Sequence, residues 1–376
     1  MAGIYIHIPF CKQKCHYCNF FSLASNKYRD EFVKALLQEM EMKSDYLKGE
    51  EVRTVYIGGG TPSMLEVSDI HLISEKLNTL FSISKDAEIT LEANPDDISK
   101  VYLKALKSTF VNRLSIGIQS FFADDLHYLH RVHDEVQSRK AIEEARDAGF
   151  DKFTIDLIYG IPTLTNEKWL KNLEYFFATG INHLSAYALT VEPRTSLSHL
   201  ISKGRMPAVD EMQSAQHFEM LIEKMEEKGF IHYEISNFAR PGHYSKHNSI
   251  YWLGGNYLGL GPSAHSYNGV SRQWNVSNLA KYIQNAALEG SVAEKEVLTM
   301  EQLYNEYVMT SLRTSWGCDL EHIRNGFGLF FLEHCIKESN RFIELQELRL
   351  DNNRLYLTNK GKLFADGIAS AMFMDS

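Results

Sequence analysis

The chain has 376 residues, of which 44% are hydrophobic and 23% charged, a composition typical of folded globular proteins and sufficient for one large domain and a smaller one. Its 39 lysines and arginines face 48 aspartates and glutamates, so the net charge is −9, which argues against nucleic acid as a partner. No apolar run is long enough to span a membrane and the N-terminus lacks the features of a signal peptide, so we expect a cytoplasmic protein.

The first predicted element, a strand over residues 3–8, is followed at once by three cysteines. Cys11, Cys15 and Cys18 form a C-x3-C-x2-C pattern. A cubane iron–sulfur cluster ordinarily takes four thiolates, so a set of three leaves one iron open to a ligand that is not protein. A zinc site completed by His16 is the alternative, because zinc prefers four tetrahedral ligands. The two remaining cysteines lie far along the chain, and an odd total fits a reducing compartment better than a disulfide framework.

Strand-like runs and helical patterns then alternate over the first half of the chain. β-branched and aromatic residues predict strands over residues 3–8, 53–57, 88–92, 113–118, 153–158 and 183–189. Helical patterns between them include residues 27–48 and 136–148. Alternating strands and helices indicate a parallel sheet. We therefore expect an α/β fold, a partial (β/α)6 barrel of the TIM type that is open on one side.

Residues suited to binding or catalysis follow the ends of these strands. The run Gly-Gly-Gly-Thr-Pro at 58–62 follows the second strand, Glu92 ends the third, Gln119 follows the fourth and Asp156 lies in the fifth. Strand ends meet at one face of such barrels, so these residues predict one shared cavity. Glycines let backbone N–H groups approach a ligand. Glu92 needs a buried partner, such as an ammonium group, a ribose hydroxyl or a neighbouring basic residue.

The last part of the chain predicts a small separate module. Helical patterning at 209–228 precedes a glycine- and aromatic-rich stretch. A helix is then expected over 299–313, a hairpin over 340–357, and a final helix capped by Thr358. Helices with a small hairpin predict an α+β, winged-helix-like module. It lacks a basic face, which favours a packing or lid role over DNA binding.

We accordingly divide the chain into three parts. Residues 1–239 form the barrel, residues 240–296 form an aromatic- and glycine-rich extension that packs on it, and residues 297–376 form the winged-helix-like domain.

The cysteine pattern and several later motifs together resemble the radical S-adenosylmethionine (SAM) superfamily, and within it the oxygen-independent coproporphyrinogen III oxidase group. The matching motifs are YIHIPFC at 5–11, GGGTP at 58–62, GIQS at 117–120, DLIYG at 156–160 and GLGPSAH at 259–265. The resemblance implies that Cys11, Cys15 and Cys18 hold a [4Fe–4S] cluster whose open iron binds SAM. It also implies a set of SAM contacts: Tyr5, Tyr17, Gly59, Gly60, Thr61, Glu92, Gln119, Arg131, Asp156 and Ala188. In the oxidase relatives the positions of Gln119, Arg131 and Asp156 hold a second SAM, so one or two SAM sites remain open.

Two departures separate this chain from the oxidase. Phe20 stands where the oxidase has a fourth cysteine, and the chain begins at the barrel strand. Both features are similar to the HemW haem chaperone subgroup, whose H-N-x-x-Y-W motif also occurs here at residues 247–252. The resemblance implies that His247, Tyr251 and Trp252 bind haem, with His247 as the iron ligand. A core turn with a hydrogen-bonded histidine is the alternative.

The predicted function is a haem chaperone on a radical SAM scaffold, which binds a [4Fe–4S] cluster, SAM and haem and passes haem to an acceptor protein, for example a membrane haem enzyme. The rival is an enzyme, the oxygen-independent coproporphyrinogen III oxidase of porphyrin biosynthesis, which uses a SAM-derived radical. A radical SAM enzyme with an unrelated substrate is a third option. We assign no catalytic residue, and the sequence leaves open whether the chain forms a homodimer.

Overall fold

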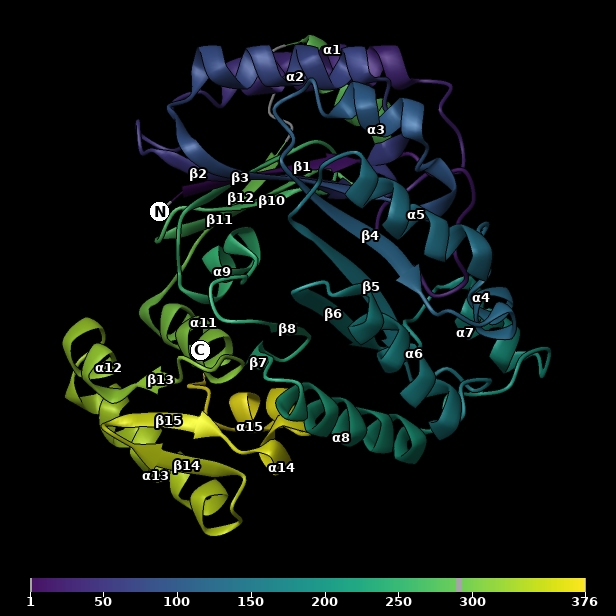
Figure 1. Ribbon diagram of the computed structural model, residues 1–376. Helices are drawn as coiled ribbons and strands as arrows, with labels where there is room; N and C mark the ends of the chain where they lie inside the picture. The colour runs from purple at the N-terminus through teal and green to yellow at the C-terminus, as the bar shows by residue number, and fades with distance from the viewer. Residues whose placement is uncertain (1, 289–292, 376) are drawn as a thin grey trace.

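The computed structural model describes residues 2–288 and 293–375. Its centre is a partial barrel of six parallel strands that pair in chain order (Figure 1). These strands are β1 (Ala2–Ile8), β2 (Val52–Gly59), β3 (Ile83–Ala93), β4 (Arg113–Gln119), β5 (Phe153–Tyr159) and β6 (His183–Ala188). All six expected strands are confirmed, and β3 begins earlier than predicted.

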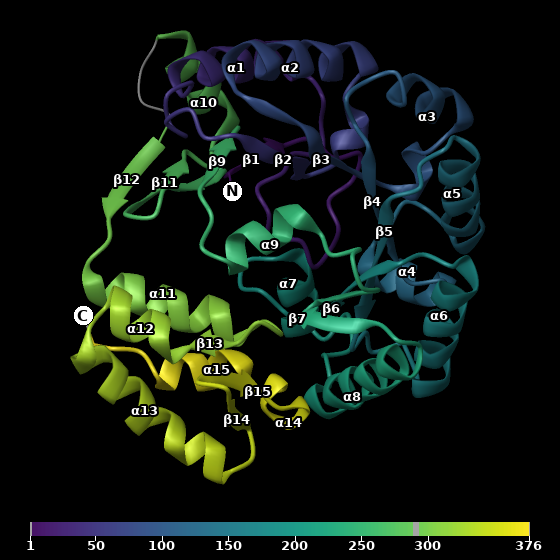
Figure 2. The same cartoon turned by 60° about the vertical axis from the view of Figure 1, so that its left-hand side comes forward.

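Helices cover the outer face of this barrel (Figures 1 and 2). They are α1 (Arg29–Met42), α2 (Val67–Leu80), α3 (Lys100–Leu106), α4 (Ala123–Leu129), α5 (Glu135–Asp147) and α6 (Asn166–Thr179), with short 3-10 turns η1 (Pro62–Met64) and η2 (Pro95–Asp97). The helix predicted at 136–148 is α5, which begins at a capping box between Asp134 and Gln137. The helix predicted at 27–48 ends sooner, at Met42, because turns lead from there into β2.

Alternation along the strands separates an aliphatic outer face from a polar inner face. In β1, Ile4, Ile6 and Ile8 are fully buried in the core beneath the helices. The residues between them face the barrel lumen, as do the alternate residues of the other strands. The lumen-facing residues include Tyr56 and Ser115, so the barrel interior is a polar chamber, whereas many barrels are filled with branched apolar side chains.

The sheet continues beyond the six parallel strands on both sides. On the β1 side it adds β9 (Tyr257–Leu260), β10 (His265–Tyr267), β11 (Ser271–Asn275) and β12 (Ala293–Val297), and on the β6 side it adds β8 (Asn237–Ala239) and β7 (Ile231–Glu234). Helices α7 (Ser196–Ser202), α8 (Glu211–Glu227), α9 (Lys246–Trp252) and α10 (Leu279–Ala287) accompany these strands. The helix predicted at 209–228 is therefore confirmed as α8.

Segment 240–296, of which 289–292 lie outside the described residues, lengthens the barrel sheet through β9, which pairs in parallel with β1. Figure 2 shows α9 inside the curve of the sheet. It contacts the first halves of β1 and β2, so it closes the amino-terminal end of the lumen, which we call the floor; the opposite end is the mouth. The three-part division of the chain remains a prediction.

The C-terminal part has its own core and combines helices with a small antiparallel sheet, as expected for a winged-helix-like module. Its elements are α11 (Met300–Leu312), β13 (Cys318–Asp319), α12 (Leu320–Gly326), α13 (Leu329–Glu344), β14 (Leu348–Asp351), β15 (Arg354–Leu357), α14 (Asn359–Lys362) and α15 (Ala365–Ala371). The hairpin is shorter than the predicted range 340–357, because the first residues of that range extend α13. Thr358 caps a helix as predicted, by accepting a bond from Gly361 N at 3.1 Å, but that helix is α14 and the last helix is α15.

Candidate functional site

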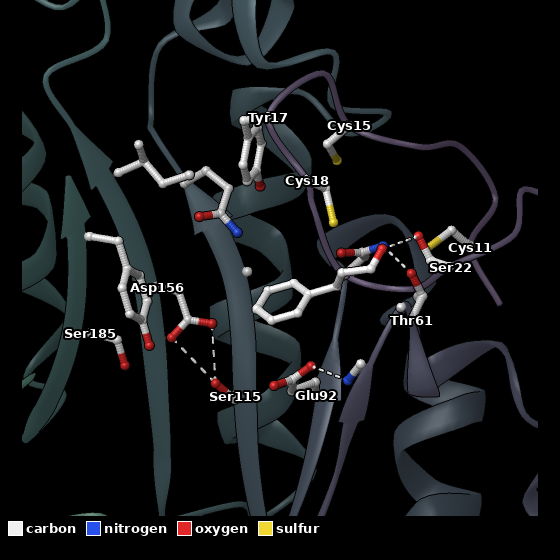
Figure 3. Close-up of a pocket in the computed structure, with 18 of the residues that line it drawn as sticks. Cys11, Cys15, Tyr17, Cys18, Ser22, Thr61, Glu92, Ser115, Asp156 and Ser185 are labelled. Carbon is white, nitrogen blue, oxygen red and sulfur yellow. Dashed lines mark hydrogen bonds between the residues drawn. The ribbon is translucent and has the colours of Figure 1, made fainter. Parts of the chain in front are cut away.

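A cavity of 430 Å³ opens at the mouth of the barrel and brings together nearly every residue expected to bind the cluster or SAM (Figure 3). Its lining includes Cys11, Cys15, Tyr17, Cys18, Gly59, Gly60, Thr61, Glu92, Gln119, Arg131, Asp156 and Ala188. They converge because parallel strands present their carboxyl ends on one face. The volume lies in the usual range for small-molecule sites, about 300 to 1,000 Å³.

The three cysteines lie on the irregular loop that follows β1. Cys11 N donates to Leu23 O at 2.9 Å, which ties the start of the loop to its return. Figure 3 shows Cys11 beside Thr61, with Cys15 and Cys18 further along the loop. Burial raises the pKa of the Cys11 thiol, so an electropositive ligand would be needed to hold it as a thiolate.

The cysteine loop was predicted to hold a polynuclear cluster, with a zinc ion as the alternative. Among the described residues, no three histidine, cysteine or acidic side chains converge as one metal ion would require. The three cysteines of a cubane bind three different irons and need only line one wall. His16, the alternative zinc ligand, stacks instead on His130, with ring centroids 4.2 Å apart.

Arg131 places a positive charge against the cysteine loop. Its Nη1 lies 3.4 Å from Cys15 Sγ, and its Nη2 donates to Asn94 Oδ1 at 2.7 Å and to Gly117 O at 3.0 Å. Its Nε is buried without a hydrogen-bond partner in the described structure. A carboxylate ligand or a thiolate would satisfy this remaining donor.

The glycine run lets the backbone approach both the cysteine loop and a carboxylate. Gly59 has a positive φ of 113° and donates its N–H to Glu92 Oε2 at 3.1 Å. A Cβ on Gly60 would stand 2.6 Å from Phe10 O and 2.9 Å from Cys11 Sγ, so no side chain fits there. This close approach explains the need for glycine in the motif.

Two carboxylates, Glu92 and Asp156, lie in the wall of the cavity. Burial, opposed by hydrogen bonds from Tyr56 and Gly59, raises the pKa of Glu92 to about 7. Burial likewise raises the pKa of Asp156 to about 6, and Ser115 Oγ donates to both of its oxygens, at 3.3 and 3.1 Å. A bound cation would recover the cost of charging these groups, which suits the amino group and the sulfonium of SAM.

Sequence reasoning missed the deeper part of this cavity. Its wall consists of lumen-facing polar side chains: Arg113, Ser115, Thr154, His183, Ser185 and Asn248. Arg113 is 5% exposed, lies 3.9 Å from Glu88, and has a buried Nη2 without a partner in the described structure. The sequence pattern that could have revealed this wall is the alternation of polar and aliphatic residues in the barrel strands, which predicts a hydrated lumen.

Four of the predicted ligand-binding residues do not line the cavity: Tyr5, His247, Tyr251 and Trp252. Tyr5 bonds through its hydroxyl to His7 Nδ1 at 3.1 Å and stacks on Tyr56. His247 is 1% exposed, with Nδ1 bonded to Thr54 Oγ1 and Nε2 to Tyr251 OH, both at 2.8 Å. Burial, with the charge of Arg113, lowers the pKa of His247 to about 3, so the ring is neutral.

The H-N-x-x-Y-W motif therefore closes the floor of the lumen. Ligation of iron by His247 would require the Tyr251 hydroxyl to leave Nε2, so it remains a prediction. Trp252 lies outside the lumen, where the guanidinium of Arg313 stands 5.4 Å from its ring.

Among the described residues, no helix has the length and apolar character needed to cross a membrane.

Comparisons with known proteins identify the family of this chain. Residues 5–176 match the Radical SAM superfamily and residues 298–364 match the HemN C-terminal domain. The chain is 36% identical to the heme chaperone HemW of Bacillus subtilis, with 99% of both chains covered, and 33% identical to that of Mycobacterium tuberculosis, covering 98% of this chain and 94% of the other. A solved structure of coproporphyrinogen III oxidase HemN from Escherichia coli, a radical SAM enzyme, matches with a TM-score of 0.86 at 25% identity, covering 99% of this chain and 90% of the other.

Proposed function

Because this chain belongs to the HemW family of the radical SAM superfamily, we propose that it is a haem chaperone. It binds a [4Fe–4S] cluster, SAM and haem, and transfers haem to an acceptor protein in the cytoplasm or at a membrane haem enzyme. The observation that carries this proposal is the full-length similarity to proteins named heme chaperone HemW, which is greater than the identity to the oxidase of the same fold.

The residues at the mouth of the barrel fit the cluster and SAM. Cys11, Cys15 and Cys18 would ligate the cluster, and the guanidinium of Arg131 lies 3.4 Å from Cys15 Sγ. The cluster, when bound, supplies an open iron and a one-electron redox couple. Glu92 accepts hydrogen bonds from Gly59 N and Tyr56 OH, which fixes its carboxylate for a ligand amino group or hydroxyl.

The rival function is oxidation of coproporphyrinogen III, which the HemN fold also supports. Phe20 argues against it, because this residue lines the cluster cavity at the position of the oxidase's fourth cysteine. In a chaperone the cluster and SAM would regulate haem transfer or dimerisation, and turnover of SAM would be dispensable.

Anaerobic assays of the reconstituted protein separate the two functions. The protein is incubated with reductant, SAM and coproporphyrinogen III, and in parallel is loaded with haem and mixed with an apo haem enzyme. The chaperone predicts haem transfer to the apo-enzyme and no formation of protoporphyrinogen. Catalytic formation of protoporphyrinogen without haem transfer would overturn the proposal.

A further inference from the structure

A second, larger hollow lies beside the cluster cavity, between the barrel and the C-terminal part. This groove has a volume of 900 Å³ and is bordered by the loop after β6, the first turns of α8, and α14 with α15. Figure 1 shows α8 alongside α14 and α15. Ala188, Leu189 and Thr190 line both the groove and the cluster cavity, so the two hollows are adjacent.

The walls of the groove are mainly apolar. Val209, Ala215 and Phe218 line the barrel side, and Leu363 and Phe364 line the opposite side. Phe364 is 54% exposed, so its ring is available to a ligand in the groove. Apolar walls on two sides suit a flat apolar ligand.

One corner of the groove leads into a small cationic recess of 120 Å³. Arg313 and Lys362 line both the groove and the recess, and Arg349 lines the recess alone. These side chains come from three elements: the end of α11, β14 and α14. Their convergence is independent of the apolar walls and points to an anionic group.

Part of this positive charge is uncompensated. Arg313 pairs with Asp366, and Arg349 pairs with Asp351 at 3.4 Å. The buried carboxylate of Glu234 also lines the recess and accepts a bond from Asn237. Lys362 donates to Asn359 Oδ1 and has no ion pair in the described part of the chain. The Nε of Arg313 is buried without a partner among the described residues.

We infer that haem binds in this groove, with its ring between α8 and the α14–α15 segment and its propionates directed into the recess of Arg313, Arg349 and Lys362. Haem has the required chemistry, because it is a flat apolar macrocycle with two carboxylates on one edge. This inference rests on the proposed function, namely that the chain binds haem, and assigns the place of binding away from His247.

The side chains of the groove would allow haem to leave as well as to bind. The described lining residues include Tyr159 but no histidine, cysteine or methionine. Burial raises the pKa of Tyr159, so it remains a neutral phenol and a poor iron ligand. Haem held mainly by apolar contact and its propionates keeps its iron available to the ligands of an acceptor.

Titration with haem, followed by the Soret band, tests this placement. Ala215→Trp fills the groove, and Met212→Trp on the exposed face of α8 is the matched control, since Met212 is 74% exposed and does not line the groove. We expect Ala215→Trp to weaken haem binding at least about tenfold, by steric exclusion from the contact surface, and Met212→Trp to bind as the wild type does.

A double variant that removes two positive charges tests the recess without filling the groove. Arg349→Gln with Lys362→Gln should weaken haem about tenfold but leave the dimethyl ester of haem unaffected, because the ester carries no propionate charge. The control removes two exposed lysines elsewhere, Lys104→Gln with Lys171→Gln, and should change neither affinity.

The outcomes separate the two proposals. Saturable wild-type binding that Ala215→Trp and the recess variant leave unchanged overturns the placement and leaves the proposed function standing. The absence of saturable haem binding by the folded wild type overturns the proposed function, and the placement with it. Circular dichroism of each variant verifies its fold.

Discussion

Replacing His247 by alanine should destabilise the barrel by about 2 to 4 kcal/mol. The imidazole makes two hydrogen bonds of 2.8 Å, to Thr54 Oγ1 and Tyr251 OH, in a site that is 1% exposed. Each buried partner left without its bond costs about 1 to 3 kcal/mol. Water in the adjacent polar lumen can bond to the freed partners and so reduce this cost. The expected loss of stability therefore lies in the lower part of the range obtained by adding the costs of the two partners.

Urea denaturation of the apo protein, followed by circular dichroism, measures this loss. Asn248→Ala is the matched control, because Asn248 lies on the same helix and lines the cavity, and its side chain makes no hydrogen bond in the described structure. We expect its stability to stay within about 1 kcal/mol of the wild type. A His247→Ala variant of unchanged stability that has lost its haem Soret band would refute the structural role and identify His247 as a ligand.

Three further predictions concern the mouth of the barrel. Cys15→Ser should abolish the iron–sulfur absorbance at about 400 nm after anaerobic reconstitution. The control Cys335→Ala, in the core of the C-terminal part, should retain this absorbance. Equal iron content in the two variants would contradict the cluster assignment. Arg131→Lys should weaken SAM binding at least about tenfold in calorimetry, because lysine cannot reproduce the fork that contacts Cys15 and Asn94; wild-type affinity would exclude a role for the guanidinium. Glu92, whose pKa of about 7 exceeds its ordinary 4.5, stabilises the apo fold below pH 4.5 and loses this contribution as the pH rises to 7, a loss on the order of 3 kcal/mol. Glu92→Gln should flatten that part of the urea-midpoint profile, and an unchanged slope would contradict the raised pKa.

The sequence was sufficient to predict the barrel and its mouth. Strand-length runs of β-branched residues, alternating with helical patterns, located all six parallel strands. The position of Glu92 and Asp156 near strand ends then predicted a common cavity, because parallel strands fix the direction of each end. The positions of the strands and of their ends follow from local sequence patterns, so they could be predicted without knowledge of contacts between residues distant in sequence.

Features that depend on contacts distant in sequence were harder to predict. His247 meets Thr54 only because α9 enters the barrel, so its burial could not be read from the motif. The groove joins α8 to α14 across more than a hundred residues and has no motif. The start of the hairpin was misplaced because the apolar pattern of α13 runs directly toward β14.

Haem titration of the wild-type protein tests the central claim most directly. The account predicts that the anaerobically reconstituted chain develops a Soret band that saturates at one haem per chain. Failure to reach saturation, with absorbance that grows in proportion to added haem as it does in buffer, would contradict a haem chaperone.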